Sequence, residues 1–174
     1  MIRKVIQAGD PRLRKVSKPV GEIDKKIRLL ISDLKETLKA HKDPEGVGLA
    51  APQIGKNLRI FIMEDGKNYK TVINPKIISV KKIKPTKGNK KEALEGCLSV
   101  PHYYGPLTRG EVIKIEYLNE EGEKVIETFK DFPAQIVQHE IDHLNGFLFI
   151  DRLLEQKRPL YQINDGEAEE VDFI

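Results

Sequence analysis

The sequence has very little cysteine and no long apolar run. Among its 174 residues there is one cysteine, Cys97. A single cysteine cannot form an internal disulfide, which excludes a disulfide-stabilised secreted scaffold and favours a reducing compartment. No stretch approaches the roughly 18 apolar residues that a membrane-spanning helix needs, and no secretory signal is recognisable. We therefore expect a cytoplasmic protein without a membrane-spanning segment.

An excess of one sign of charge is also missing. The formal net charge is +3 on a chain in which 33% of residues are charged, too mild to indicate nucleic-acid binding on its own. We expect no direct sequence-specific contact with nucleic acids. The length is typical of one domain, so we predict a single catalytic domain over 1–174. Its last residues, 165–174, are acidic and lack lysine and arginine, which is typical of a flexible tail.

The most informative segment is 139–143, which reads His-Glu-Ile-Asp-His. His139 and His143, four residues apart on a helix, would point from one face and could hold one metal ion. Glu140 would lie beside that ion and could take a proton from metal-bound water. Apolar residues at helical spacing support a helix that ends at Asn145-Gly146. On this motif alone, surface histidines on an amphipathic helix remain an equal alternative.

A third ligand is needed, because catalytic metals in proteins usually have three protein ligands. Cys97 is one candidate, although a lone cysteine is most often a small buried apolar residue. Gly96 and Pro101 bracket its segment and favour a turn at which backbone comes close to another group. His102 is a weaker competing candidate.

The segment 46–55 is small, apolar and rich in glycine, with one amide side chain, Gln53. It lacks the Gly-Lys-Ser/Thr ending of a phosphate-binding loop. A tight loop packed on the core is one interpretation. The other is that the small residues let a substrate backbone lie against the chain, with Gln53 as a neutral donor aimed into the site.

Together these three segments resemble peptide deformylase. That family is marked by GxGLAAPQ, EGCLS and QHExDH, and residues 46–53, 95–99 and 138–143 here read GVGLAAPQ, EGCLS and QHEIDH, in the family's order. The resemblance covers roughly 5–154. It implies a hydrolase that removes the formyl group from the N-terminal formyl-methionine of newly made polypeptides. It also implies short antiparallel sheets around a central helix that carries HExxH.

The residues and the resemblance together predict a site. Cys97, His139 and His143 would bind one divalent ion. Their thiolate and imidazole groups suit zinc, iron and nickel, and the resemblance favours Fe²⁺ in the cell. Glu140 would be the base that activates the metal-bound water. The side-chain N–H of Gln53 and the backbone N–H of Leu98 would stabilise the oxyanion.

Substrate contacts are predicted less directly. The backbone of Val47 and Gly48 could pair with the peptide as an added strand, and Ile136 suits an apolar pocket for the methionine side chain. Gln135 is more polar than such a pocket leads one to expect. Arg109 could contact the substrate or brace its loop, and we favour bracing. Asp142 would lie near a ligand histidine, as an acceptor or in a helix salt bridge, and an ordinary role on the helix surface is an equal alternative.

The pattern of elements predicts the α+β class. We expect a helix over 24–40, strands at 59–63, 71–74 and 77–80, and a hairpin of 112–118 with 124–129. The lysine-rich segment 81–91 is interpreted as a solvated loop rather than a polyanion site.

Two other functions remain open. A zinc endopeptidase uses the same HExxH, although a cysteine ligand would be unusual there. A catalytically silent metal-binding or ribosome-associated protein could share the fold, but the intact Glu140, Gln53 and Cys97 argue against it. Members of the peptide deformylase family often end in a basic helix that is linked to the ribosome surface. The acidic tail here departs from that pattern, so any transient ribosome contact is not expected to use the C-terminus.

Overall fold

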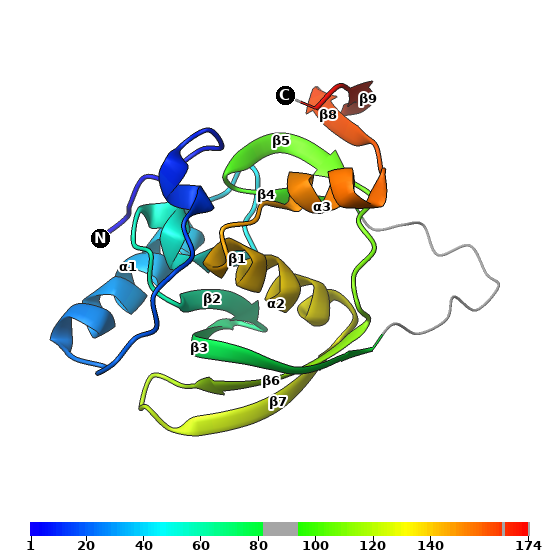
Figure 1. Cartoon of the computed structure of the whole chain (residues 1–174). Helices are drawn as coiled ribbons and strands as arrows, with labels where there is room; N and C mark the ends of the chain where they lie inside the picture. Colours follow the sequence, from blue (N-terminus) through cyan, green and yellow to red (C-terminus); the bar gives the residue numbers. More distant parts are fainter. Residues whose placement is uncertain (82–93, 165, 174) are drawn as a thin grey trace.

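The computed structural model describes residues 1–81, 94–164 and 166–173 (Figure 1). Within them the chain forms three α-helices, two short 3-10 helices and nine strands, and the strands make two antiparallel sheets. The predicted α+β class with antiparallel sheets is confirmed. None of the described helices has both the length and the apolar character needed to cross a membrane. Most of the lysine-rich segment 81–91 lies outside the described residues.

The larger sheet has five strands in the order β1-β2-β3-β6-β7. Its members are β1 (Gly48–Ala50), β2 (Ile60–Asp65), β3 (Asn68–Lys81), β6 (Val112–Leu118) and β7 (Lys124–Lys130). The two strands expected at 71–74 and 77–80 are one strand, β3. Its register shifts near Pro75, which cannot donate a ladder hydrogen bond, and Asn74 there has a φ of 51°.

The smaller sheet has four strands in the order β4-β5-β8-β9. Its members are β4 (Glu95–Cys97), β5 (Val100–Gly105), β8 (Leu160–Asn164) and β9 (Glu167–Val171). β4 and β9 are therefore the two edges of this sheet. β9 lies in the acidic tail and pairs with β8 along its whole length. The flexibility of that tail stays a prediction.

Three α-helices complete the fold: α1 (Lys25–Ala40), α2 (Asp131–Leu144) and α3 (Phe149–Gln156). α1 confirms the predicted helix, and the side chain of Asp24 caps it by accepting a hydrogen bond from the Ile27 N–H at 2.9 Å. The 3-10 helices η1 (Pro11–Arg14) and η2 (Ala51–Ile54) are single turns. In Figure 1, α2 runs between the larger sheet and the β4–β5 strands.

The larger sheet is covered on both faces. Successive side chains of a strand point to opposite faces, so Phe61 and Met63 pack into the core beneath α2, whereas Ile60 and Ile62 pack into the core beneath α1. Burial on both sides explains the unbroken apolar run in β2. A third core lies under α3 and contains Cys97. The HExxH motif therefore lies on α2, which packs onto the larger sheet, and Cys97 belongs to the separate core under α3.

Candidate active site

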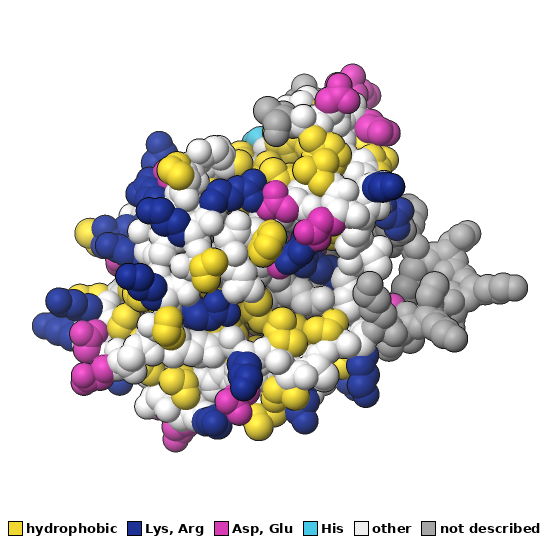
Figure 2. Space-filling model, in the orientation of Figure 1, with side chains coloured by type: hydrophobic (Ala, Val, Ile, Leu, Met, Phe, Trp, Pro, Cys, Tyr) yellow, Lys and Arg dark blue, Asp and Glu magenta, His cyan; other side chains and the backbone are white. Residues whose placement is uncertain are grey.

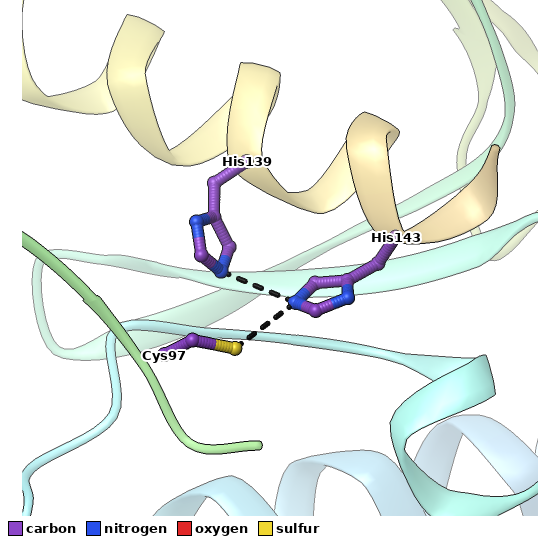
Figure 3. Close-up of side chains that lie close together, drawn as sticks. All are labelled: Cys97, His139 and His143. Atoms are coloured by element: carbon purple, nitrogen blue, oxygen red, sulfur yellow. Dashed lines mark hydrogen bonds between the residues drawn. The ribbon is translucent and has the colours of Figure 1, made fainter. Parts of the chain in front are cut away.

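Cys97, His139 and His143 come together at the junction of β4 and α2. Their possible ligand atoms all lie within 4.8 Å of one another, and all three residues are buried. The Nε2 of His143 is 3.2 Å from the Sγ of Cys97 and 3.2 Å from the Nε2 of His139. Figure 3 shows both rings pointing from α2 toward Cys97. The helix supplies the two imidazoles because residues four apart share a face.

The chemistry of these donors fits a metal ion. The Nδ1 of His139 lies 2.7 Å from Oε1 of Glu95. A carboxylate only accepts hydrogen bonds, so Nδ1 carries the proton and the Nε2 lone pair faces the cluster. One sulfur and two ring nitrogens thus converge on one point in a buried setting. Such a set of thiolate and neutral imidazoles could hold one divalent cation.

Glu140 lies beside the cluster and is enclosed. Its Oε2 has no hydrogen-bond partner among the described residues, and burial raises its pKa to about 7. A Cβ atom at position 48 would overlap the carboxylate, so the glycine at Gly48 makes room for it. A carboxyl group with a pKa near the working pH can both accept and release a proton.

Gln53 is fixed in one orientation on η2. Its Oε1 accepts a hydrogen bond from the backbone N–H of Ala50 at 2.8 Å. Its Nε2 therefore faces the cluster, 3.1 Å from the Oγ of Ser99 and 3.5 Å from the Sγ of Cys97. The sulfur also accepts from the Ser99 N–H at 3.4 Å. The amide nitrogen of Gln53 thus faces Cys97 and Ser99, and Leu98 lies between these two residues in the chain. The role of Gln53 and Leu98 as oxyanion donors stays a prediction.

A buried ionic network lies behind His139. Arg109 holds both oxygens of Glu95, with its Nη2 2.7 Å from Oε1 and its Nε 3.0 Å from Oε2, and its Nη1 lies 2.6 Å from Asp142. Asp142 is also paired with Arg152 at 2.7 Å. Burial alone would raise the pKa of Glu95, but hydrogen bonds from Arg109 and His139 outweigh it and lower that pKa to about 2. The network ties β4 to α2 and α3.

The family assignment rests on this geometry and on likeness to known proteins. A family model described as polypeptide deformylase matches residues 2–159. The chain belongs to this family. The resemblance seen in the three motifs is thereby confirmed, and with it a hydrolase of the deformylase type.

Individual relatives agree. The peptide deformylase of Pseudothermotoga lettingae is 48% identical over 91% of this chain and 86% of its own length, and that of Thermotoga maritima is 41% identical over 87% of each. A solved peptide deformylase structure from Thermus thermophilus has a TM-score of 0.78 and 38% identity, covering 90% of this chain and 88% of that one. The Thermotoga maritima structure gives 0.77 and 39%, over 87% and 97%.

A pocket is lined in part by Cys97 and His139 of the cluster of Cys97, His139 and His143. The predicted residues Val47, Gly48 and Ile136 line it, together with Gln53, Leu98, His139 and Glu140. The lining also includes Tyr104. It further includes Pro44, Leu94 and Phe132, to which the sequence analysis assigned no role. His102 is exposed and lies neither in the pocket lining nor in the cluster.

Sequence reasoning gave Glu95 no role. A signal was available, because Glu95 and Cys97 stand two apart and therefore share one face of a strand. Of the roles considered for Asp142, the structure shows ion pairs, with Arg109 and Arg152, and the side chain is buried rather than on the helix surface. The acceptor for His139 is Glu95. Arg109 is ion-paired to both Glu95 and Asp142, in line with a bracing residue.

Proposed function

We propose that this chain removes the formyl group from the N-terminal formyl-methionine of newly synthesised polypeptides. Membership in the deformylase family supports the activity. The single observation that carries the proposal is the convergence of Cys97, His139 and His143 beside an enclosed Glu140, next to a pocket that Cys97, His139 and Glu140 help to line. The helix with HExxH would be the centre of the fold, with the sheets arranged around it.

Cys97, His139 and His143 would hold one divalent ion. We assign Fe²⁺ in the cell, and the same donor set also suits Zn²⁺ and Ni²⁺. When bound, the ion supplies Lewis acidity toward water and toward the formyl oxygen. Glu95 contributes by fixing the ring orientation of His139, and Arg109 contributes by holding Glu95 in place.

Glu140 would carry the proton through the reaction. Water attacks the formyl carbon, Glu140 accepts a proton from that water, and it delivers the proton to the amine as the C–N bond breaks. The products are formate and a peptide with a free amino group. The enclosed position of Glu140, with Oε2 free of other described partners, supports this role.

Gln53 and Leu98 would stabilise the oxygen that becomes negative as water adds. The amide of Gln53 is held by Ala50, so its N–H groups are already oriented toward the cluster before the reaction begins. A donor fixed in advance costs no reorganisation in the transition state. The backbone N–H of Leu98 would be the second donor.

The peptide would add a strand beside β1. β1 is an edge strand whose one neighbour in the sheet is β2, so the backbone of Val47 and Gly48 can pair with an extended peptide. Ile136 would then form part of the pocket for the methionine side chain. Action on nascent chains places the enzyme in the cytoplasm, with at most transient ribosome contact that does not use the acidic C-terminus.

One assay separates the three candidate functions. Protein loaded with metal under anaerobic conditions is incubated with a formyl-Met peptide and with an unblocked peptide of the same sequence. We expect release of formate from the first and no cleavage of the second. Internal cleavage of either peptide would indicate an endopeptidase. Metal binding without formate release or cleavage would indicate a silent metal-binding protein.

A further inference from the structure

The amide side chain of Gln135 is part of the pocket lining. Gln135 lies one helical turn before His139 on α2, and the apolar side chains of Leu94, Phe132 and Ile136 line the same pocket. A half-buried amide among apolar neighbours is unfavourable unless its polar atoms have partners. The hydrogen bonds of the Gln135 amide therefore decide which of its polar atoms could bind a molecule in the pocket.

The contact with Glu95 fixes the orientation of this amide. The Nε2 of Gln135 lies 3.3 Å from Oε2 of Glu95, whose two oxygens are also held by Arg109. An ion-paired carboxylate accepts hydrogen bonds and donates none, so the nitrogen of the amide must face it. An amide nitrogen has two hydrogens, and Glu95 takes one. Among the described residues the side chain of Gln135 has no other hydrogen bond, so one N–H is left for the pocket.

We propose that Gln135 determines specificity in this pocket, where its remaining N–H binds a hydrogen-bond acceptor on the first side chain of the formylated peptide. The inference rests on the proposed deformylation and deepens it. The thioether sulfur of methionine is a weak acceptor. The oxygen of methionine sulfoxide is a much stronger one. The substrates then include peptides that begin with N-formyl-methionine sulfoxide, which a wholly apolar pocket would reject.

The physical reason is the cost of burying an unpaired polar group. A sulfoxide oxygen placed against leucine would lose its water and gain no partner, a penalty that corresponds to about 5- to 150-fold in affinity. With Gln135 in place the oxygen gains a hydrogen bond, and most of that penalty disappears. Norleucine, which replaces the sulfur by a methylene group, is the matching side chain without an acceptor.

The test compares kcat/KM for three formyl peptides that differ only in the first residue: methionine, methionine sulfoxide and norleucine. The metal-loaded protein is compared with its Gln135→Leu variant. We expect the protein to hydrolyse the sulfoxide peptide within about tenfold of the methionine peptide. In Gln135→Leu the sulfoxide-to-methionine ratio should fall by at least a further ~10-fold, mainly through KM, while norleucine gains relative to methionine.

Two further variants complete the test, one as a control and one as a replacement for Gln135→Leu. Phe132→Leu changes an apolar rim residue of the same pocket, so it should alter KM for all three peptides while leaving their ratios within about twofold. Gln135→Met, which is unbranched, takes the place of Gln135→Leu if the latter does not fold, as judged by thermal unfolding and metal content.

Equal sulfoxide-to-methionine ratios in the protein and the Gln135 variant would overturn the inference. Failure to release formate from the methionine peptide would instead overturn the proposed function.

Discussion

The two edges of the smaller sheet use glutamate in opposite ways. On β4, Glu95 has a relative exposure of 4% and is held by Arg109 and His139. On β9, Glu167, Glu169 and Glu170 are exposed, and acidic side chains gather at this end of the molecule in Figure 2. A buried carboxylate must have partners in fixed positions, because an unpaired buried charge is very unfavourable. An exposed carboxylate is hydrated by water and does not fix the position of any other side chain.

The comparison shows where charge organises the site. The one charged side chain of β4, Glu95, is tied to His139 of the candidate metal site, whereas β9 carries exposed carboxylates of the kind that disfavour pairing of an edge strand with another chain. We therefore expect changes near β4 to affect metal binding and catalysis, and chemically equal changes on β9 to have little effect.

The largest effect is expected from Cys97→Ala. Cys97 is the sole cysteine, so its removal leaves two imidazoles and no replacement thiolate. We expect this variant to lose most of its metal and to release no measurable formate. Elemental analysis of the purified, folded variant checks this. Full metal occupancy would refute the assignment of Cys97 as a ligand.

Gln53→Ala should have the next largest effect. An oriented donor that acts only in the transition state is worth roughly 2.7–4 kcal/mol, so kcat should fall by about 100- to 1,000-fold with KM nearly unchanged. Steady-state kinetics on the folded fraction, alongside thermal unfolding, measure both quantities. A lower melting temperature with unchanged kcat would reduce Gln53 to a residue that only stabilises its loop.

Glu95→Gln tests the comparison itself. Loss of the charge weakens the hold on His139, and partners of this kind typically contribute about 10- to 100-fold to metal affinity. We expect a chelator to remove the metal correspondingly more readily. The matched control is Glu169→Gln, the same chemical change on the opposite edge. Equal metal affinity in the two variants would show that burial of Glu95 contributes nothing to the metal site.

The smallest effect is expected when the charge of β9 is reversed. In the double variant Glu169→Lys/Glu170→Lys, kcat/KM for a formyl-Met peptide should stay within about twofold, and stability within about 0.5 kcal/mol, because both side chains are exposed. A loss of tenfold or more would mean that the acidic edge takes part in substrate binding.

Residues under strong physical constraint were the ones that the sequence could predict. Periodic apolar residues predicted α1, and alternation around a turn predicted the β6–β7 hairpin. The HExxH spacing and Cys97 predicted the three residues that the structure brings together. In each case one short stretch of sequence carries the information, because helical spacing or strand alternation fixes which side chains share a face.

What depends on distant partners could not be predicted. β4 is only three residues long and forms through pairing with β5, so it has little local signal. β9 lies in the acidic segment 165–174, whose composition suggests a tail, and this strand forms through its pairing with β8. Glu95 has its role because Arg109, 14 residues away, and His139, 44 residues away, meet it in space. Tertiary contacts decide such features, and periodicity does not report them.

The central claim is that Cys97, His139 and His143 hold the metal while Glu140 moves the proton. Its most direct test is metal content and formate release measured on one sample of Glu140→Gln, which keeps the size of the side chain but removes the base. We predict one ion per chain, as in the unaltered protein, with kcat lowered at least ~100-fold. A loss of only a few-fold with the metal retained would contradict the claim, because another group would then be transferring the proton.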